Sequence, residues 1–385
     1  MVSKIFSEKK FFVILILAIV AKLCLFVFGT MKVPESRMLY DSSSYLETAK
    51  CLAEKGQFAR ENQDQVLEPE SFRTPGYPAF LAVFHHHLKV PIIGILLIQL
   101  MLTVAAGLIT YRVAQHIDKK IALLSATIVL FDPPVSIFSV MVLTETLFLV
   151  LLALFLLAAI QYFKNRKLYW LGWSAIFLAL ATYVRPISYF LAIPLAGFIL
   201  FAHRAPSFKR VIRDVAVFFL LVYGLLGAWQ VRNYLCCQTA SFATVGSHNF
   251  IARGFFKDMP KQDHFLSQGC ALAEKGWTCF VSMMTQPGSL KYFKNKFATT
   301  VGKCFFYPWM AFWLLGFLAG CYGLKKNIFY QFLFLVVLYF LAVTILNIGV
   351  LASERFRAPM MPAIAILSAF GWSEIILWLK GKNKV

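Results

Sequence analysis

The sequence predicts an all-α integral membrane protein with about ten transmembrane helices. Apolar residues make up 59% of the 385 residues and charged residues only 15%, whereas a soluble domain of this size needs far more charge to cover its surface. The apolar residues also gather in stretches long enough to cross a hydrocarbon core, which takes about 20 helical residues. We therefore expect a single polytopic membrane domain over residues 1–385.

The first span is expected at residues 11–30. A basic segment precedes it, but no small-residue cleavage site follows, so we interpret it as a retained helix and not as a removed signal peptide. The other spans are expected at residues 92–113, 119–139, 144–163, 168–184, 187–202, 213–232, 307–323, 327–349 and 358–379. Pro186 is expected to divide a hairpin of two short helices.

The net charge of +20 does not predict binding to nucleic acid. The basic residues form small clusters between the apolar stretches and do not line one soluble face. Every short loop on one side of the predicted bundle is basic, whereas most acids fall on the other side. The positive-inside rule then places both termini in the cytoplasm of a multi-pass protein.

Two long segments are expected on the outer side. The first, residues 31–90, is predicted to hold an interfacial helix that starts near Asp41, carries an apolar face from Tyr45 onward and stops at Gly56. The second, residues 233–306, has weaker helical patterns at residues 267–275 and 289–300.

The eight cysteines and the His85-His86-His87 run give a weak metal signal. The cysteines have no metal-ligand spacing, and consecutive histidines on a helix point in different directions. A Cys270–Cys279 bridge is one arrangement open to an oxidising compartment. No cofactor is predicted, and a divalent metal is left open.

Charged residues gather at the outer ends of several predicted spans, and such positions are the default functional candidates in a membrane protein. They are Asp41, Glu145, Arg185, Glu354, Arg355 and Arg357. A carboxylate beside arginines at the lipid boundary suits one reaction: a sugar on a lipid phosphate is attacked by an acceptor hydroxyl, the carboxylate takes the proton, and the arginines stabilise the departing phosphate.

Structural interpretations stand beside this chemistry. Asp41 also fits a helix cap, Glu145 an ion-pair partner, and Arg73 a residue that pins a turn. The arginines at the outer ends of the spans also fit side chains that reach phospholipid headgroups.

Six motifs along the chain together resemble a known family. They are Asp41-x-x-x-Tyr45, Arg73-Thr74-Pro75-Gly76-Tyr77-Pro78, Thr144-Glu145, Arg185-Pro186, Trp229-x-x-Arg232-Asn233 and Arg355-x-Arg357-x-Pro359-x-x-Pro362. In this order they are similar to the polyprenyl-phosphate-dependent glycosyltransferases of the GT-C fold, among them family 39 mannosyltransferase-like and aminoarabinose-transferase-like enzymes.

The resemblance implies an inverting sugar transfer on the extracytoplasmic face of a bacterial inner (plasma) membrane, in the biosynthesis of lipopolysaccharide or another cell-envelope glycan. It implies an undecaprenyl- or dolichyl-phosphate sugar as donor, and a glycan, lipid or protein as acceptor. It places the catalytic base on Asp41, although Ser42 stands where some relatives have a second acid. Acceptor recognition is expected in residues 233–306.

The chemistry above assigns the remaining site residues. Asp41 and Glu145 are the predicted catalytic carboxylates, and Arg73, Arg185, Arg355 and Arg357 are predicted to bind the donor phosphate. The alternative from another class is a transporter or flippase of a lipid-linked sugar, which would place its polar groups near the bilayer midplane and carry inverted repeats.

Overall fold

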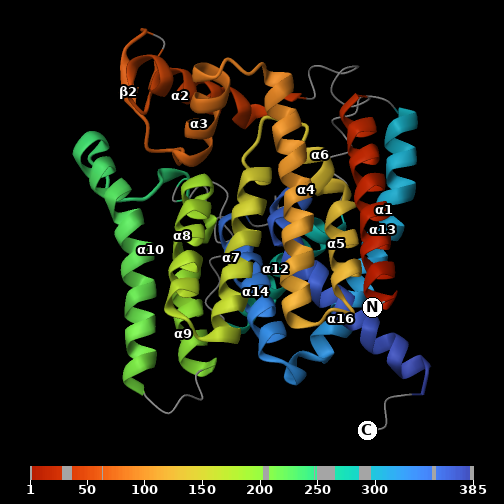
Figure 1. The fold of residues 1–385 in the computed structure, drawn as a ribbon. Helices are drawn as coiled ribbons and strands as arrows, with labels where there is room; N and C mark the ends of the chain where they lie inside the picture. The colour runs from red at the N-terminus through yellow and green to blue at the C-terminus, as the bar shows by residue number, and fades with distance from the viewer. Residues whose placement is uncertain are drawn as a thin grey trace.

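A computed structural model describes residues 2–27, 37–62, 64–202, 208–246, 248, 265–285, 296–348 and 353–381. Long helices stand side by side in a bundle, and a small cap covers one end (Figure 1). The elements up to the middle of the chain are α1 (Val2–Phe26), α2 (Tyr40–Lys55), β1 (Ala59–Glu61), β2 (Leu67–Pro69), α3 (Gly76–Leu81), η3 (Ala82–His87), α4 (Ile92–Ile117), α5 (Ala122–Leu130), α6 (Pro133–Phe138), α7 (Glu145–Asn165) and α8 (Leu168–Val184). The later ones are η4 (Pro186–Leu191), α9 (Ala192–Ala202), α10 (Phe208–Cys237), α12 (Phe265–Thr285), α13 (Lys296–Tyr322), η6 (Leu324–Lys326), α14 (Ile328–Ile348), α15 (Glu354–Arg357), η8 (Ala358–Met360) and α16 (Met361–Leu379).

Within the described residues, six helices are long and apolar enough to cross a membrane. They are Ile92–Ile117, Glu145–Asn165, Phe208–Cys237, Gly302–Tyr322, Ile328–Asn347 and Glu354–Leu379. Leu168–Val184 and Pro186–Ala202 are shorter apolar helices. The multi-pass membrane architecture is thus supported by length and composition, while the expected number of ten spans stays a prediction.

The helix expected over residues 119–139 is divided into α5 and α6. Pro133 disfavours helical backbone at the residue before it, and Asp132 there has an extended conformation, with φ −65° and ψ 121°. The Asp132 Oδ1 atom accepts a hydrogen bond from the Val135 N–H at 3.1 Å and so caps α6. The Asp-Pro-Pro sequence therefore ends one helix and starts another.

The cap consists of α2, α3 and the hairpin of β1 and β2, and it lies at the opposite end of the bundle from the start of α1 and the end of α16 (Figure 1). The expected helix is α2, and Gly56 ends it with φ +66°. The N-cap is Leu39, whose N–H is bonded to the Ser42 hydroxyl, so Asp41 lies in the first turn and is not the cap. The strands pair antiparallel with Arg60 opposite Glu68.

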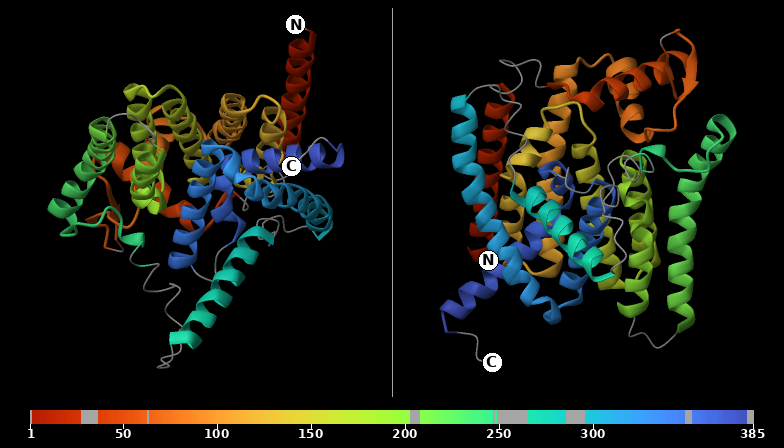
Figure 2. Two further views of the ribbon diagram at one scale, coloured as in Figure 1. Left: turned by 90° about the horizontal axis from the view of Figure 1, so that it is seen from below. Right: turned by 180° about the vertical axis from the view of Figure 1, so that it is seen from behind.

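The second long segment contains α12, which covers the helix expected at residues 267–275. It crosses the bundle obliquely (Figure 2) and packs against α14 and α15. Most of the helix expected at residues 289–300 lies outside the described residues; α13 begins at Lys296. Cys270 and Cys279 share α12, nine residues or about 13 Å apart along its axis. That separation rules out a bridge between them, and Cys279 is a free, buried thiol.

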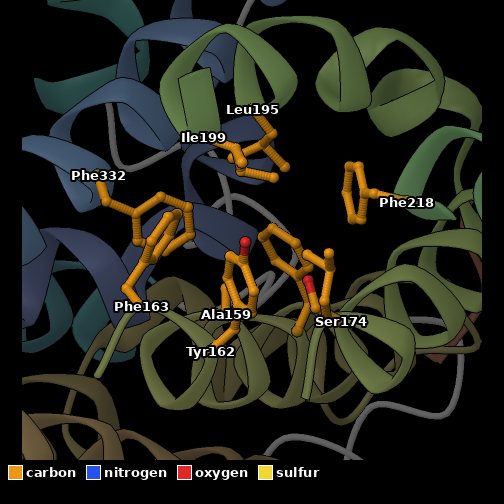
Figure 3. A pocket seen from close by; sticks show the side chains of 10 residues that line it. Ala159, Tyr162, Phe163, Ser174, Leu195, Ile199, Phe218 and Phe332 are labelled. Carbon is orange, nitrogen blue, oxygen red and sulfur yellow. The ribbon is translucent and has the colours of Figure 1, made fainter. Parts of the chain in front are cut away.

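Close helix packing and aromatic side chains fill the bundle. A Cβ atom on Gly371 of α16 would lie 1.9 Å from the Gly316 carbonyl of α13, so only glycine allows this approach. A small apolar cavity with a volume of about 10 Å³ lies beside Tyr162 and Phe163 of α7 (Figure 3). Tyr162 is 17 residues after Glu145, or about 25 Å along the helix axis. This cavity is therefore remote from the charged residues at the start of α7.

Candidate active site

The structure brings together five of the six predicted site residues. They are Asp41 in α2, Arg73 before α3, Glu145 at the start of α7, Arg185 at the end of α8 and Arg355 in α15. Three guanidinium groups therefore face two carboxylates, and one positive charge is left over. We refer to these five residues as the charge cluster.

Asp41 is the more accessible carboxylate of the charge cluster. Its Oδ1 atom accepts from Arg73 Nη2 at 2.7 Å, and its Oδ2 atom accepts from Arg355 Nη1 at 2.8 Å. Burial alone would raise the pKa of Asp41, but Arg355 and then Arg73 outweigh burial and lower that pKa to about 2. The low pKa keeps the Asp41 carboxylate ionised, and its side chain, which is 24% exposed, remains open to a ligand.

Glu145 is the buried carboxylate of the charge cluster, with its side chain 3% exposed. Its Oε1 atom pairs with Arg185 Nη1 at 2.7 Å and also accepts from Arg355 Nε. Its Oε2 atom accepts from the Thr144 hydroxyl at 3.3 Å. Glu145 is thus enclosed by its partners and holds Arg185 and Arg355 beside each other.

Arg73 reaches Asp41 because the motif around it is bound to the bundle. The Thr74 hydroxyl donates to the Val184 carbonyl at 3.0 Å, one residue before Arg185. Gly76 lies against the backbone of Tyr183, where a Cβ atom would be 2.8 Å from the carbonyl carbon and oxygen. Only glycine permits this contact, so the Arg-Thr-Pro-Gly string joins the cap to the end of α8.

Neighbouring residues in α2 complete the surroundings of Arg73. Its Nε donates to the Ser44 hydroxyl at 3.0 Å, and its guanidinium carbon lies 4.8 Å from the centre of the Tyr45 ring. Such a cation–π contact restrains the guanidinium plane. Burial raises the pKa of Tyr45, so its hydroxyl stays protonated beside the two charges.

Arg357, the sixth predicted site residue, lies apart from the charge cluster. Its side chain is 1% exposed, and its Nη1 donates to Asp132 Oδ2 at 3.1 Å. Its guanidinium carbon lies 4.6 Å from the centre of the Trp313 ring. Lys22 is buried nearby, with its ammonium 2.7 Å from the Ser136 hydroxyl. Arg357 therefore belongs to a second polar group inside the bundle.

The sequence analysis did not identify some residues that lie near the predicted site residues, although two of these, Lys22 and Asp132, have a recognisable sequence pattern. Lys22 is a charge inside the predicted first span, and an intramembrane charge is a functional or structural candidate by default. Asp132 precedes two prolines and so reads as a helix cap. Ser44 has no such signal, because an ordinary polar residue gives no sequence pattern for its partner.

A divalent metal does not fit between the two carboxylates as they stand. Arg355 bridges them, with one nitrogen at Asp41 and another at Glu145. A cation at that position would meet the guanidinium group before it met both carboxylates. Within the part of the chain that the structure describes, no three histidine, cysteine, aspartate or glutamate residues group to hold a metal.

The comparisons with known proteins agree with the class that the motifs predict. Residues 72–229 match the family model described as dolichyl-phosphate-mannose-protein mannosyltransferase. This stretch contains Arg73, Glu145 and Arg185 of the charge cluster. No curated protein matches the sequence closely enough to count as a relative.

Solved structures show the fold. The oligosaccharyltransferase AglB from Archaeoglobus fulgidus, in complex with an inhibitory peptide and a dolichol-phosphate, superposes with a TM-score of 0.60 at 12% identity, over 99% of this chain and 52% of AglB. ArnT from Cupriavidus metallidurans, bound to undecaprenyl phosphate, superposes with a TM-score of 0.51 at 13% identity, over 94% of this chain and 62% of ArnT. The chain thus spans about half the length of AglB. These superpositions confirm the fold that the motifs predict, and the family model supports that prediction over residues 72–229.

Proposed function

We propose that the protein transfers a sugar from a polyprenyl-phosphate donor to an acceptor hydroxyl, with inversion at the anomeric carbon. The observation that carries the proposal is the charge cluster, in which one accessible carboxylate lies among three arginines beside the outer cap. The acceptor oxygen attacks the anomeric carbon and loses its proton to the carboxylate. The bond from that carbon to the phosphate oxygen breaks, and its electron pair stays on the lipid phosphate.

Asp41 is the base in this proposal, because its side chain is the more exposed of the two carboxylates. General base catalysis needs a group within hydrogen-bond reach of the proton it removes. Glu145 is enclosed by Arg185, Arg355 and Thr144, so its part is to orient the two arginines.

The arginines receive the donor phosphate. Guanidinium groups donate in a fixed fork that matches phosphate oxygens. Arg73 and Arg355 donate hydrogen bonds to Asp41 in the structure. When the two guanidinium groups donate to a phosphate instead, their interaction with Asp41 becomes weaker. The pKa of Asp41 then rises from about 2 toward its ordinary value, which makes it a stronger base once the donor is bound.

We further propose an orientation in the membrane. Both termini lie in the cytoplasm in this proposal, and the charge cluster lies on the extracytoplasmic face of a bacterial inner membrane; the basic ends of the helices support this orientation. AglB is described with dolichol-phosphate and a peptide, and ArnT with undecaprenyl phosphate. By analogy, this chain takes a lipid-phosphate donor, and the acceptor is a glycan, a lipid or a protein.

The test is the Asp41→Asn variant in membranes supplied with undecaprenyl-phosphate sugars and envelope extract. We expect sugar transfer to fall by about 10²- to 10⁴-fold, the usual contribution of a general base. Asp64→Asn, an exposed carboxylate in the same outer segment, should keep full activity. Mass spectrometry of lipids and glycans from a deletion strain should identify the sugar and acceptor. Full activity of Asp41→Asn would remove Asp41 as the base, and movement of the lipid-linked sugar across vesicle membranes without any transfer would favour a transporter.

A further inference from the structure

A buried glutamate holds the turn from which Arg73 extends. The side chain of Glu70 is 2% exposed. Its Oε1 atom accepts from the backbone N–H of Phe72 at 2.5 Å and of Arg73 at 3.2 Å, and its Oε2 atom pairs with Arg60 of β1. Two consecutive N–H groups that end on one carboxylate oxygen fix the direction of the chain at Arg73.

The same turn is also attached to α10. Arg232 donates from Nη1 to the Glu70 carbonyl at 2.6 Å and from Nη2 to the Phe58 carbonyl at 2.5 Å. The Thr244 N–H donates to the Ser71 carbonyl at 2.9 Å. The outer end of α10 and the segment after it therefore hold the backbone on the N-terminal side of Arg73.

On the C-terminal side of Arg73, Thr74 is bonded to the end of α8. The backbone of Arg73 thus lies between two fixed points. Because the backbone is fixed, only the side-chain rotamer of Arg73 has to be selected for its Nη2 to lie 2.7 Å from Asp41. This lowers the entropy cost of ordering a long side chain.

We propose that Glu70 is the positioning residue that aims Arg73 at Asp41 and at the donor phosphate. This inference rests on the proposed function, since it assigns a part in that reaction. Glu70 touches no reacting group, because its oxygens are taken by two backbone N–H groups and Arg60. It acts through the placement of Arg73 alone.

Two substitutions separate placement from charge. Glu70→Ala removes the acceptor of both N–H groups and should lower kcat/KM for the donor by about 10- to 100-fold, the cost of misplacing a group by about 1 Å. Glu70→Gln keeps an acceptor oxygen and loses only the pairing with Arg60, so it should stay within about fivefold of the wild type. Glu68→Ala, an exposed residue of β2, is the matched control.

A double-mutant cycle with Arg73→Ala gives the decisive measurement. Once Arg73 is gone, Glu70→Ala should change kcat/KM by less than about twofold, because a residue that acts only through another adds nothing in its absence. The affinity for undecaprenyl phosphate, measured by microscale thermophoresis in detergent, should follow the same pattern. Each purified variant is first compared with the wild type by thermal unfolding.

The outcomes distinguish the inference from the proposed function. Full additivity of the two substitutions in an active enzyme, or equal losses for Glu70→Gln and Glu70→Ala, would overturn the positioning assignment and leave the proposed reaction standing. A wild type that neither transfers sugar nor binds undecaprenyl phosphate would overturn both.

Discussion

Arg355 is the residue whose removal should disturb the charge cluster most, because it alone contacts both carboxylates. Its Nη1 lies 2.8 Å from Asp41 Oδ2, and its Nε donates to Glu145. The Arg355→Met substitution keeps the length of the stem and removes both bonds. Charge-assisted hydrogen bonds contribute about 1.5–3 kcal/mol each, so about 3–6 kcal/mol of pairing is lost.

The part of this loss that appears in the transition state sets the effect on the rate. Removing one preorganised donor to developing negative charge costs about 10²- to 10³-fold in rate, and we expect a loss of this size in kcat/KM for Arg355→Met. Arg355→Lys keeps a positive charge but has no planar fork to serve two carboxylates and a phosphate. We expect it to lie between the wild type and Arg355→Met.

The assay is the transfer of labelled sugar from undecaprenyl phosphate in detergent or proteoliposomes. Arg112→Met, an exposed arginine that contacts Gln115 in α4, is the control for loss of charge. Variants that elute and unfold like the wild type are then compared. Less than tenfold loss for Arg355→Met, together with a larger loss for Arg73→Met, would refute the reasoning that removal of Arg355 disturbs the charge cluster most.

Three further predictions follow from named contacts. Arg73→Ala removes one of the two cations that lower the pKa of Asp41 to about 2, and this pKa should rise by about 1–3 units. As the pH is lowered, kcat/KM of the variant should therefore begin to fall at a higher pH than that of the wild type; an unchanged pH profile would contradict this. Asp132→Ala leaves Arg357 buried without its carboxylate and should destabilise the fold by about 3–5 kcal/mol; an unchanged thermal midpoint would rule this out. Gly76→Ala places a Cβ atom 2.8 Å from the Tyr183 carbonyl and should cost about 1–3 kcal/mol in unfolding free energy, whereas stability equal to the wild type would show that the cap can shift.

The sequence predicts the helices well where local signals agree. α2 ends at Gly56, as a glycine after an apolar face suggests, and α7 begins at Glu145 beside the expected start. The break between α5 and α6 was not predicted, because the span over residues 119–139 was predicted from its hydropathy and the helix-ending Asp132-Pro133 pair was not considered. Hydropathy reports burial, and only backbone sterics report where a helix stops.

The charge cluster could be predicted in outline because charges are costly near hydrocarbon and so converge on one another. The sequence could not predict that Arg355 belongs to the charge cluster and that Arg357 does not. Residues two apart on a helix point about 200° away from each other, so one faces Asp41 and the other faces Asp132. Which arginine faces which carboxylate depends on how α15 packs, and a motif of alternating arginines does not contain that information.

The two carboxylates differ in burial, and this difference gives the charge cluster its direction. Glu145 is enclosed and holds Arg185 and Arg355 beside each other. Asp41 is partly exposed and is paired with Arg73 and Arg355. In the proposed reaction the donor phosphate therefore competes with Asp41 and not with Glu145, because only the bonds of the exposed carboxylate can be exchanged without leaving a buried charge unpaired. Under this proposal the arrival of the donor and the release of the base are a single exchange of hydrogen bonds.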